Sequence, residues 1–135
     1  MPEVAKGSCL CGAVRFSVPQ TFPVAYFCHC AQCRKITGTA YASNLFADPA
    51  GFVWMSGEDR IQRFDHPSRG FTKAFCRDCG SGIPYLNSAG TRMVVPAGSL
   101  DTEPDIGAAD RIFWDDRADW CDIVDLAPHH CGFPD

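Results

Sequence analysis

Residues 28–33 read Cys28-His29-Cys30-Ala31-Gln32-Cys33, so three thiol groups fall within six consecutive positions. Two cysteine pairs lie at a distance on either side, in Cys9-Leu10-Cys11-Gly12 and in Cys76-Arg77-Asp78-Cys79-Gly80. The three clusters contain seven of the nine cysteines of the chain. Thiolate is a preferred ligand of zinc, which takes four ligands in a tetrahedral arrangement. Seven sulfurs therefore supply one complete set of four ligands and one set of three.

A glycine follows the second cysteine in both outlying pairs, at Gly12 and Gly80. In a zinc knuckle the chain turns sharply so that backbone N–H groups face the sulfurs, and glycine readily takes the positive φ that such a turn favours. The alternative for each pair is a set of buried or redox-active cysteines. Two glycine-followed pairs in one chain favour zinc. An ion that joined them would pin the N-terminal hairpin to the middle of the predicted sheet.

The central cluster has the spacing of a second metal site. Cys28 and Cys30 are two residues apart at the end of a predicted strand, so their side chains point the same way. Cys33 follows one helical turn later and returns to the same point. A helix N-terminus, together with Arg34 and Lys35, favours the thiolate form of these cysteines. The pattern predicts an open three-cysteine site with one coordination position left for water or substrate.

The other candidate ligands are weaker. His29 is an alternative fourth ligand of the central cluster, but in an extended segment its side chain points away from Cys28 and Cys30. The remaining histidines and cysteines lack partners at ligand spacing, and we expect solvated side chains for the former and partly buried free thiols for the latter: His66, His129, His130, Cys121 and Cys131.

The composition restricts the class of protein. The 135 residues include twelve Lys and Arg against sixteen Asp and Glu, which gives a formal net charge of -4. This balance argues against a nucleic-acid partner, since such proteins carry a basic face. No stretch approaches the ~20 apolar residues needed to cross a bilayer, so we expect no membrane partner. The N-terminus has no signal-peptide pattern, which predicts a cytoplasmic protein with reduced, metal-binding cysteines.

Short alternating segments separated by turn residues predict a mostly β fold of small antiparallel sheets. The expected strands are 13–18, 24–27, 41–46, 52–55, 60–64, 71–75 and 93–95. One short helix is expected over residues 31–37, with Gly38 as its stop. From Asp101 onward we expect an irregular tail that returns to pack on the sheets, anchored by residues 112–114 and Trp120. We therefore expect one zinc-binding domain over residues 1–135, with a core of about residues 7–120.

Three motifs together resemble one known family. The runs 7–14 (GSCLCGAV), 28–38 (CHCAQCRKITG) and 75–81 (FCRDCGS) are similar, in order and spacing, to the glutathione-dependent formaldehyde-activating enzyme family, which includes centromere protein V-like proteins. The resemblance covers roughly residues 7–120. It implies a β-tent with a zinc-ribbon-like arrangement and two zinc ions per chain. It assigns the structural ion to Cys9, Cys11, Cys76 and Cys79, and the catalytic ion to Cys28, Cys30 and Cys33.

The resemblance also implies an activity. Family members are carbon–sulfur lyases that add glutathione to formaldehyde and give S-hydroxymethylglutathione, so the expected partners are glutathione or another small thiol and a small aldehyde. Arg34, Lys35 and Thr37 are the expected substrate-binding residues. Lys73 and Arg69 are more distant candidates for carboxylates of glutathione, but for these two we expect solvated surface charges instead. Three alternatives stay open: a non-catalytic zinc-stabilised binding module, a lyase for another thiol adduct, and a thiol redox or metal-buffering protein.

Overall fold

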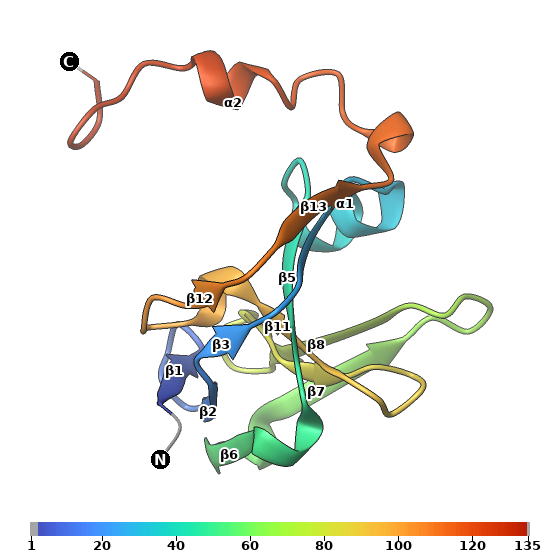
Figure 1. Cartoon of the computed structure of the whole chain (residues 1–135), viewed down its shortest axis with the longest axis vertical. Helices are drawn as coiled ribbons and strands as arrows, with labels where there is room; N and C mark the ends of the chain where they lie inside the picture. Colours follow the sequence, from blue (N-terminus) through green and yellow to red (C-terminus); the bar gives the residue numbers. More distant parts are fainter. Residues whose placement is uncertain (1–2, 135) are drawn as a thin grey trace.

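The structure, a computed structural model, describes residues 3–134, so residues 1–2 and 135 of the expected domain lie outside its described part. Within that part the chain is mostly β, with four small sheets and two short α-helices, as the sequence predicts. The sheets lie in two groups that slope towards each other (Figure 1). Each of the seven predicted strands begins and ends within two residues of the bounds of an observed strand.

The N-terminal sheet has the order β1-β2-β6 and is antiparallel throughout. It comprises β1 (Val4–Ser8), β2 (Arg15–Pro19) and β6 (Val53–Ser56). Gly7 of β1 lies opposite Phe16 of β2. A Cβ atom at Gly7 would collide with the Phe16 ring, so glycine is needed for the ring to lie flat across the neighbouring strand.

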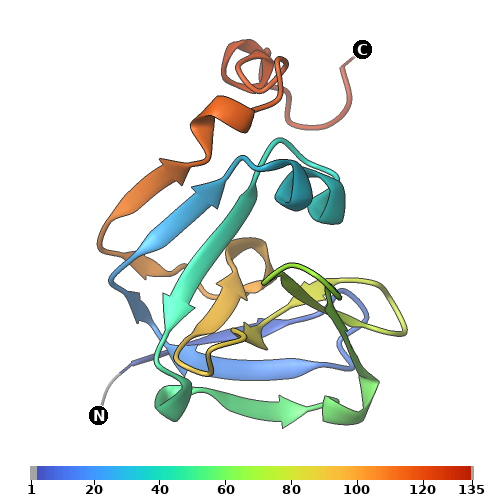
Figure 2. The same ribbon diagram turned by 90° about the vertical axis from the view of Figure 1, so that its right-hand side faces the viewer.

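The five-stranded sheet, called the long sheet below, has the order β10-β11-β5-β4-β13 and carries the central cysteine cluster at one end. Its strands are β4 (Ala25–Cys28), β5 (Ala42–Ala47), β10 (Tyr85–Leu86), β11 (Met93–Pro96) and β13 (Ala109–Ile112). Helix α1 (Ala31–Thr37) connects β4 to β5 and lies at the same end of the sheet (Figure 2). Its bounds match the predicted helix, and Gly38 ends it in the left-handed conformation.

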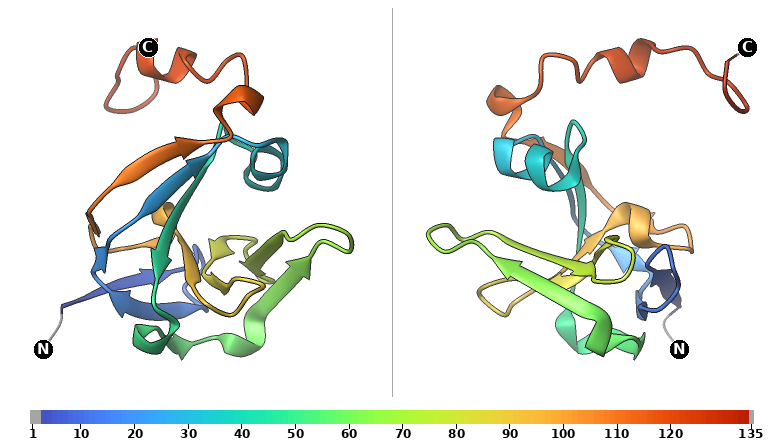
Figure 3. Two further views of the ribbon diagram at one scale, coloured as in Figure 1. Left: turned by 45° about the vertical axis from the view of Figure 1, so that its right-hand side comes forward. Right: turned by 180° about the vertical axis from the view of Figure 1, so that it is seen from behind.

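The third sheet is a hairpin with a short third strand: β7 (Ile61–Asp65), β8 (Thr72–Cys76) and β9 (Gly82–Ile83). The tip of the β7–β8 hairpin projects to the side on which α1 lies (Figure 3). Three single-turn helices complete the connections in the first 100 residues: η1 (Pro49–Gly51), η2 (Glu58–Arg60) and η3 (Ala97–Ser99).

The buried side chains form three clusters. The first lies between the N-terminal sheet and the long sheet, around Phe16, Phe22 and Leu45. The second joins Cys9 and Cys76 to Ile83. The third contains Cys28, Cys33 and Ala42. Sulfur atoms of the predicted metal ligands therefore belong to two of the three apolar clusters, and a metal bound there would hold core elements together.

The segment after Asp101 differs from the irregular tail that the sequence predicts. β12 (Asp105–Ile106) pairs in parallel with β3 (Thr21–Phe22), and β13 pairs in parallel with β4. These pairings are long-range, and they form a strand in β13 although its sequence, Ala-Asp-Arg-Ile, shows no strong strand propensity.

The rest of the tail contains η4 (Trp114–Asp116) and α2 (Ile123–Leu126), and it runs past the end of the long sheet (Figure 1). Two of the expected anchors pack on the core, because Ile112 contacts the cluster of Cys28 and the Trp114 ring lies 5.0 Å from the His29 ring. Beyond them Trp120 is 48% exposed, Leu126 84% and Phe133 98%, so the expectation is wrong for the end of the tail. No helix within residues 3–134 is long and apolar enough to cross a membrane.

Candidate functional site

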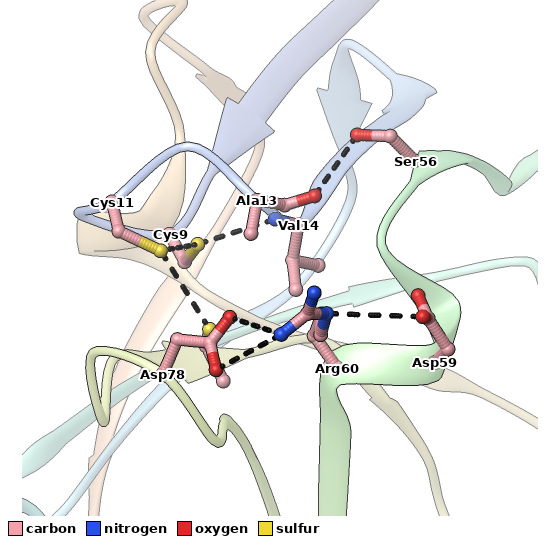
Figure 4. Close-up of polar contacts among 9 residues, drawn as sticks. Cys9, Cys11, Ala13, Val14, Ser56, Asp59, Arg60 and Asp78 are labelled. Atoms are coloured by element: carbon pink, nitrogen blue, oxygen red, sulfur yellow. Dashed lines mark hydrogen bonds and ion pairs between the residues drawn. The ribbon is translucent and has the colours of Figure 1, made fainter.

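The loop after β1 and the loop after β8 bring four cysteines together. The sulfur atoms of Cys9, Cys11, Cys76 and Cys79 all lie within 4.8 Å of one another. The Cys9 and Cys11 sulfurs are 3.6 Å apart, and 3.9 Å separates the sulfurs of Cys11 and Cys76 (Figure 4). These separations allow all four sulfurs to bind one ion, as the spacing of the pairs predicts.

The turns at both pairs have the geometry of knuckles. Gly12 has φ 82° and Gly80 has φ 79°, values that glycine adopts without strain. The backbone N–H of Val14 donates to the Cys9 sulfur at 3.3 Å. An ion pair of 3.0 Å between Arg60 and Asp78 fixes the outer side of the second turn (Figure 4). The backbone of both turns therefore directs the four sulfurs towards one another.

Ser81 connects the two turns. Its hydroxyl accepts the backbone N–H of Leu10 at 3.0 Å and lies 3.2 Å from the Cys79 sulfur. The hydrogen bond with Ser81 lowers the pKa of Cys79 to about 5. At Cys11 the hydrogen bond from the backbone N–H of Ala13 also lowers the thiol pKa. The neighbouring cysteine sulfurs outweigh this effect and raise the pKa of Cys11 to about 11. Four sulfurs this close cannot all ionise unless a cation compensates their charge, and so this donor set fits a metal ion.

The second cluster is built at the junction of β4 and α1. Cys28 ends β4, Cys30 is the N-cap residue of α1, and Cys33 lies in its first turn. Their three sulfurs also lie within 4.8 Å of one another. The backbone N–H of Cys33 donates to the Cys30 sulfur at 3.4 Å, so the cap of the helix is itself a candidate ligand.

The pKa values of these three thiols shift in different directions. Burial raises the pKa of Cys28 and that of Cys33, whose side chains are almost fully covered. Burial acts in the same direction on Cys30, but hydrogen bonds from the Cys33 backbone N–H, the Cys28 and Cys33 thiols and the Gln32 backbone N–H together outweigh it and lower the Cys30 pKa. An ion bound here would supply the positive charge that lets the two buried thiols ionise.

A groove of about 490 Å³ opens onto all three sulfurs. One wall comes from the tip of the β7–β8 hairpin, with Arg69 and Phe71, and the other from the turn after β13, with Phe113 and Asp116. Phe113 has φ 55°, a left-handed conformation that is uncommon for a bulky residue. Within residues 3–134 no fourth Cys, His, Asp or Glu joins the three sulfurs, so a metal bound there would keep a position open to this groove.

His29 does not contribute a ligand. Its ring is fully buried, 5.1 Å from the Tyr41 ring and 5.0 Å from the Trp114 ring. Its backbone N–H donates to the Ile112 carbonyl at 2.9 Å, which ties the cysteine segment to β13. Neither ring nitrogen has a hydrogen-bond partner within the described part of the chain. The side chain thus points away from the sulfurs, as alternation along an extended segment predicts.

The sequence profile of one family matches residues 4–116, a span that includes both cysteine clusters, and that family is described as glutathione-dependent formaldehyde-activating enzyme. The chain belongs to this family. Membership confirms the resemblance expected from the three cysteine motifs.

One relative supports the assignment, and one solved structure shares the fold. A protein of Halomonas elongata, provisionally described as a glutathione-dependent formaldehyde-activating enzyme, is 30% identical over 96% of this chain and 88% of its own length. A crystal structure of a Rhodobacter sphaeroides protein has a TM-score of 0.57 and 23% identity, and the match covers 71% of this chain and 87% of the other. The second comparison shows that the fold is shared.

In this member of the glutathione-dependent formaldehyde-activating enzyme family, the three predicted substrate residues do not line the groove at the three sulfurs. Arg34 and Lys35 line a separate groove of about 350 Å³ beside Trp120. The Thr37 hydroxyl donates to the Cys33 carbonyl at 2.7 Å, so it supports the helix that carries this cysteine. Arg69 is the cation that lines the groove with the sulfurs, and it donates to the Gln32 side chain at 3.0 Å. A substrate role for Arg34, Lys35 and Thr37 stays a prediction.

Sequence reasoning missed Phe113 and Asp116 as walls of the groove in this family member. Their positions depend on the parallel pairing of β13 with β4, for which the sequence has no local signal. Of the two cysteines without ligand spacing, Cys121 is half-buried and Cys131 is exposed, and both are free thiols.

Proposed function

We propose that the chain is a zinc-dependent carbon–sulfur lyase that joins a small thiol, glutathione in the first instance, to formaldehyde or a related small aldehyde. The observation that carries this proposal is the cluster of Cys28, Cys30 and Cys33, which faces a groove and has no fourth protein ligand within residues 3–134. Family membership gives the class of substrates.

We assign a structural role to the four-cysteine cluster. Cys9 and Cys11 would hold one zinc ion together with Cys76 and Cys79, which closes the coordination sphere with protein sulfur. The Cys11 and Cys76 positions are 65 residues apart, so the ion would cross-link distant parts of the chain. This favours a contribution to stability over one to chemistry.

The three-cysteine cluster would hold the second zinc ion. A zinc ion in such an open site supplies a Lewis-acid position at which a thiol is bound as thiolate near neutral pH. Cys30 is the ligand at the groove surface, while Cys28 and Cys33 anchor the site to β4 and α1.

The walls of the groove would position the reacting sulfur and the aldehyde. Phe71 and Phe113 present apolar surface next to the sulfurs, while Arg69 and Asp116 supply charges of opposite sign. In the net reaction the thiol sulfur forms a bond to the aldehyde carbon, the C=O double bond becomes a single bond, and the thiol proton ends on the new hydroxyl. Because the uncatalysed addition is bimolecular, holding both reactants together supplies much of the acceleration.

All nine cysteines are free thiols, which fits a protein that works in a reducing compartment, and we place it in the cytoplasm. The direct test of the activity is the rate of S-hydroxymethylglutathione formation, measured by exchange NMR with zinc-loaded protein. We expect a rate above that of glutathione and formaldehyde alone, in proportion to protein concentration. A rate equal to the uncatalysed one would reject this pair of substrates.

Two serine variants separate the roles of the clusters. Cys30→Ser is expected to abolish the activity and leave the fold intact, because serine still caps α1. Cys9→Ser is expected to unfold the chain or lower its melting temperature strongly, because it opens the four-sulfur site. Circular dichroism and zinc content measure both. If the two variants behaved alike, the division into a structural and a catalytic site would be wrong.

A further inference from the structure

A second cavity of this chain lies at the C-terminal end of α1, beside Ile36 and Thr37. It has a volume of about 680 Å³, larger than the groove at the three sulfurs and within the range of small-molecule sites. Loops of the four-cysteine cluster, the end of α1 and the turn after β11 enclose it. Small residues make up much of its wall: Ser8, Ser81, Ser99, Gly80, Gly82 and Gly98.

This cavity lies next to a smaller space at the three-cysteine cluster. A small chamber of about 50 Å³ has Cys33 in its wall. Four residues line both the chamber and the large cavity: Ile36, Thr37, Lys73 and Pro96. Formaldehyde needs no space of this size, so the large cavity fits the body of the other reactant.

Lys73 is the cation shared by the two spaces. It belongs to β8 and is half-buried, and no carboxylate of residues 3–134 lies within 4.0 Å of its ammonium group. Asp101 also lines the cavity, but it accepts a hydrogen bond from the Ser8 hydroxyl at 2.8 Å. Burial lowers the pKa of Lys73, while the Cys33 sulfur acts in the opposite direction. A partly buried cation without a carboxylate partner favours an anionic ligand.

Gly82 makes room for this ammonium group. A Cβ atom at Gly82 would lie 2.5 Å from Nζ and 3.2 Å from Cε of Lys73. Gly82 does not have the positive φ of Gly80, so its backbone conformation does not require glycine. The space over Gly82 therefore fixes where the Lys73 side chain lies.

We propose that Lys73 binds a carboxylate of the thiol substrate in this cavity, and so selects an acidic peptide thiol over a neutral one. The inference rests on the proposed function, because it takes glutathione as the thiol. It assigns recognition to Lys73, which lines this cavity, whereas Arg69 lines the groove at the three sulfurs. Lys73 is a binding residue here and takes no part in bond formation.

The test uses S-methylglutathione, whose blocked sulfur cannot form a thiolate, and calorimetric titration of the zinc-loaded full chain. Lys73→Met is expected to weaken binding by about 10- to 100-fold, the usual loss for one charge-assisted hydrogen bond. The matched control is Lys6→Met, which changes an exposed lysine of β1 and should leave the affinity unchanged. The diethyl ester of the probe should bind to the unaltered chain as weakly as the probe binds to Lys73→Met.

Gly82→Ala provides a second variant that keeps the charge and displaces the ammonium group, and it should also weaken S-methylglutathione binding. Equal affinity in Lys73→Met and the unaltered chain, or equal affinity for the probe and its ester, would overturn the inference. These outcomes are distinguishable from failure of the proposed function. A chain that binds the probe through Lys73 but forms no S-hydroxymethylglutathione would retain the inference and lose the proposed reaction.

Discussion

At the scale of single residues, Ser81 has a role that the cysteine pattern does not contain. Its hydroxyl contacts the Cys79 sulfur and the backbone of Leu10, so one side chain fixes both turns of the four-cysteine cluster. Groups that orient metal ligands in this way affect affinity although they do not touch the ion. The stability of the proposed zinc site thus depends on a residue outside its ligand set.

Ser81→Ala is expected to weaken zinc binding at the four-cysteine site by about 10-fold, because the hydrogen bond that favours the Cys79 thiolate is lost. Competition with a colorimetric chelator measures this affinity. Ser88→Ala, in the exposed turn after β10, is the matched control and should leave zinc affinity unchanged. Equal affinities of the two variants would show that the Ser81 hydroxyl does not support the site.

The knuckle glycines permit a cleaner test of backbone conformation. Gly80 has φ 79° and open space where a Cβ atom would lie, so Gly80→Ala changes only the backbone preference. We expect a loss of about 1 to 2 kcal/mol in the free energy of unfolding of the zinc-loaded chain. Gly98→Ala has equally open space and no positive φ, and it should cost far less. Urea denaturation followed by circular dichroism measures both, and equal losses would contradict the argument.

At the scale of elements, local sequence was sufficient for α1 and insufficient for the outer strands. Cys30 as cap and Gly38 as stop are local features, and the helix has the predicted bounds. β1 and β13 were not predicted, because Val-Ala-Lys-Gly-Ser and Ala-Asp-Arg-Ile lack a run of β-branched residues. Both form strands because a distant partner, β2 or β4, supplies the hydrogen bonds. The cysteine clusters could be predicted because their members lie two or three residues apart in the sequence. The groove walls could not, because they depend on the long-range pairing of β13 with β4.

The pairing of β13 with β4 has a consequence for the three-cysteine site. Ile112 at the end of β13 packs against the apolar cluster of Cys28, Cys33 and Ala42. Ile112→Ala is expected to cost about 2 kcal/mol in the free energy of unfolding, since a partly buried side chain is lost. We also expect weaker metal binding by the three cysteines. Ile123→Ala, at a position that is 64% exposed, is the control and should change neither quantity.

At the scale of the whole molecule, the two cysteine clusters have different relations to the fold. One joins loops from two sheets, and the other lies at the junction of a single strand and helix. Loss of an ion from the first would release a cross-link between distant segments, and loss from the second would leave the sheets connected. Stability and proposed chemistry are therefore assigned to separate parts of the structure.

This separation predicts the order in which zinc leaves the chain. A chelator of moderate affinity should remove one equivalent first, from the open three-cysteine site, because it has fewer thiolate ligands and faces a groove. Circular dichroism should change little during that step, and the chain should unfold only as the second equivalent leaves. Cys30→Ser, loaded with its single remaining ion, should show the second step alone. Unfolding that accompanied the first equivalent would mean that the three-cysteine site, and not the four-cysteine site, holds the sheets together.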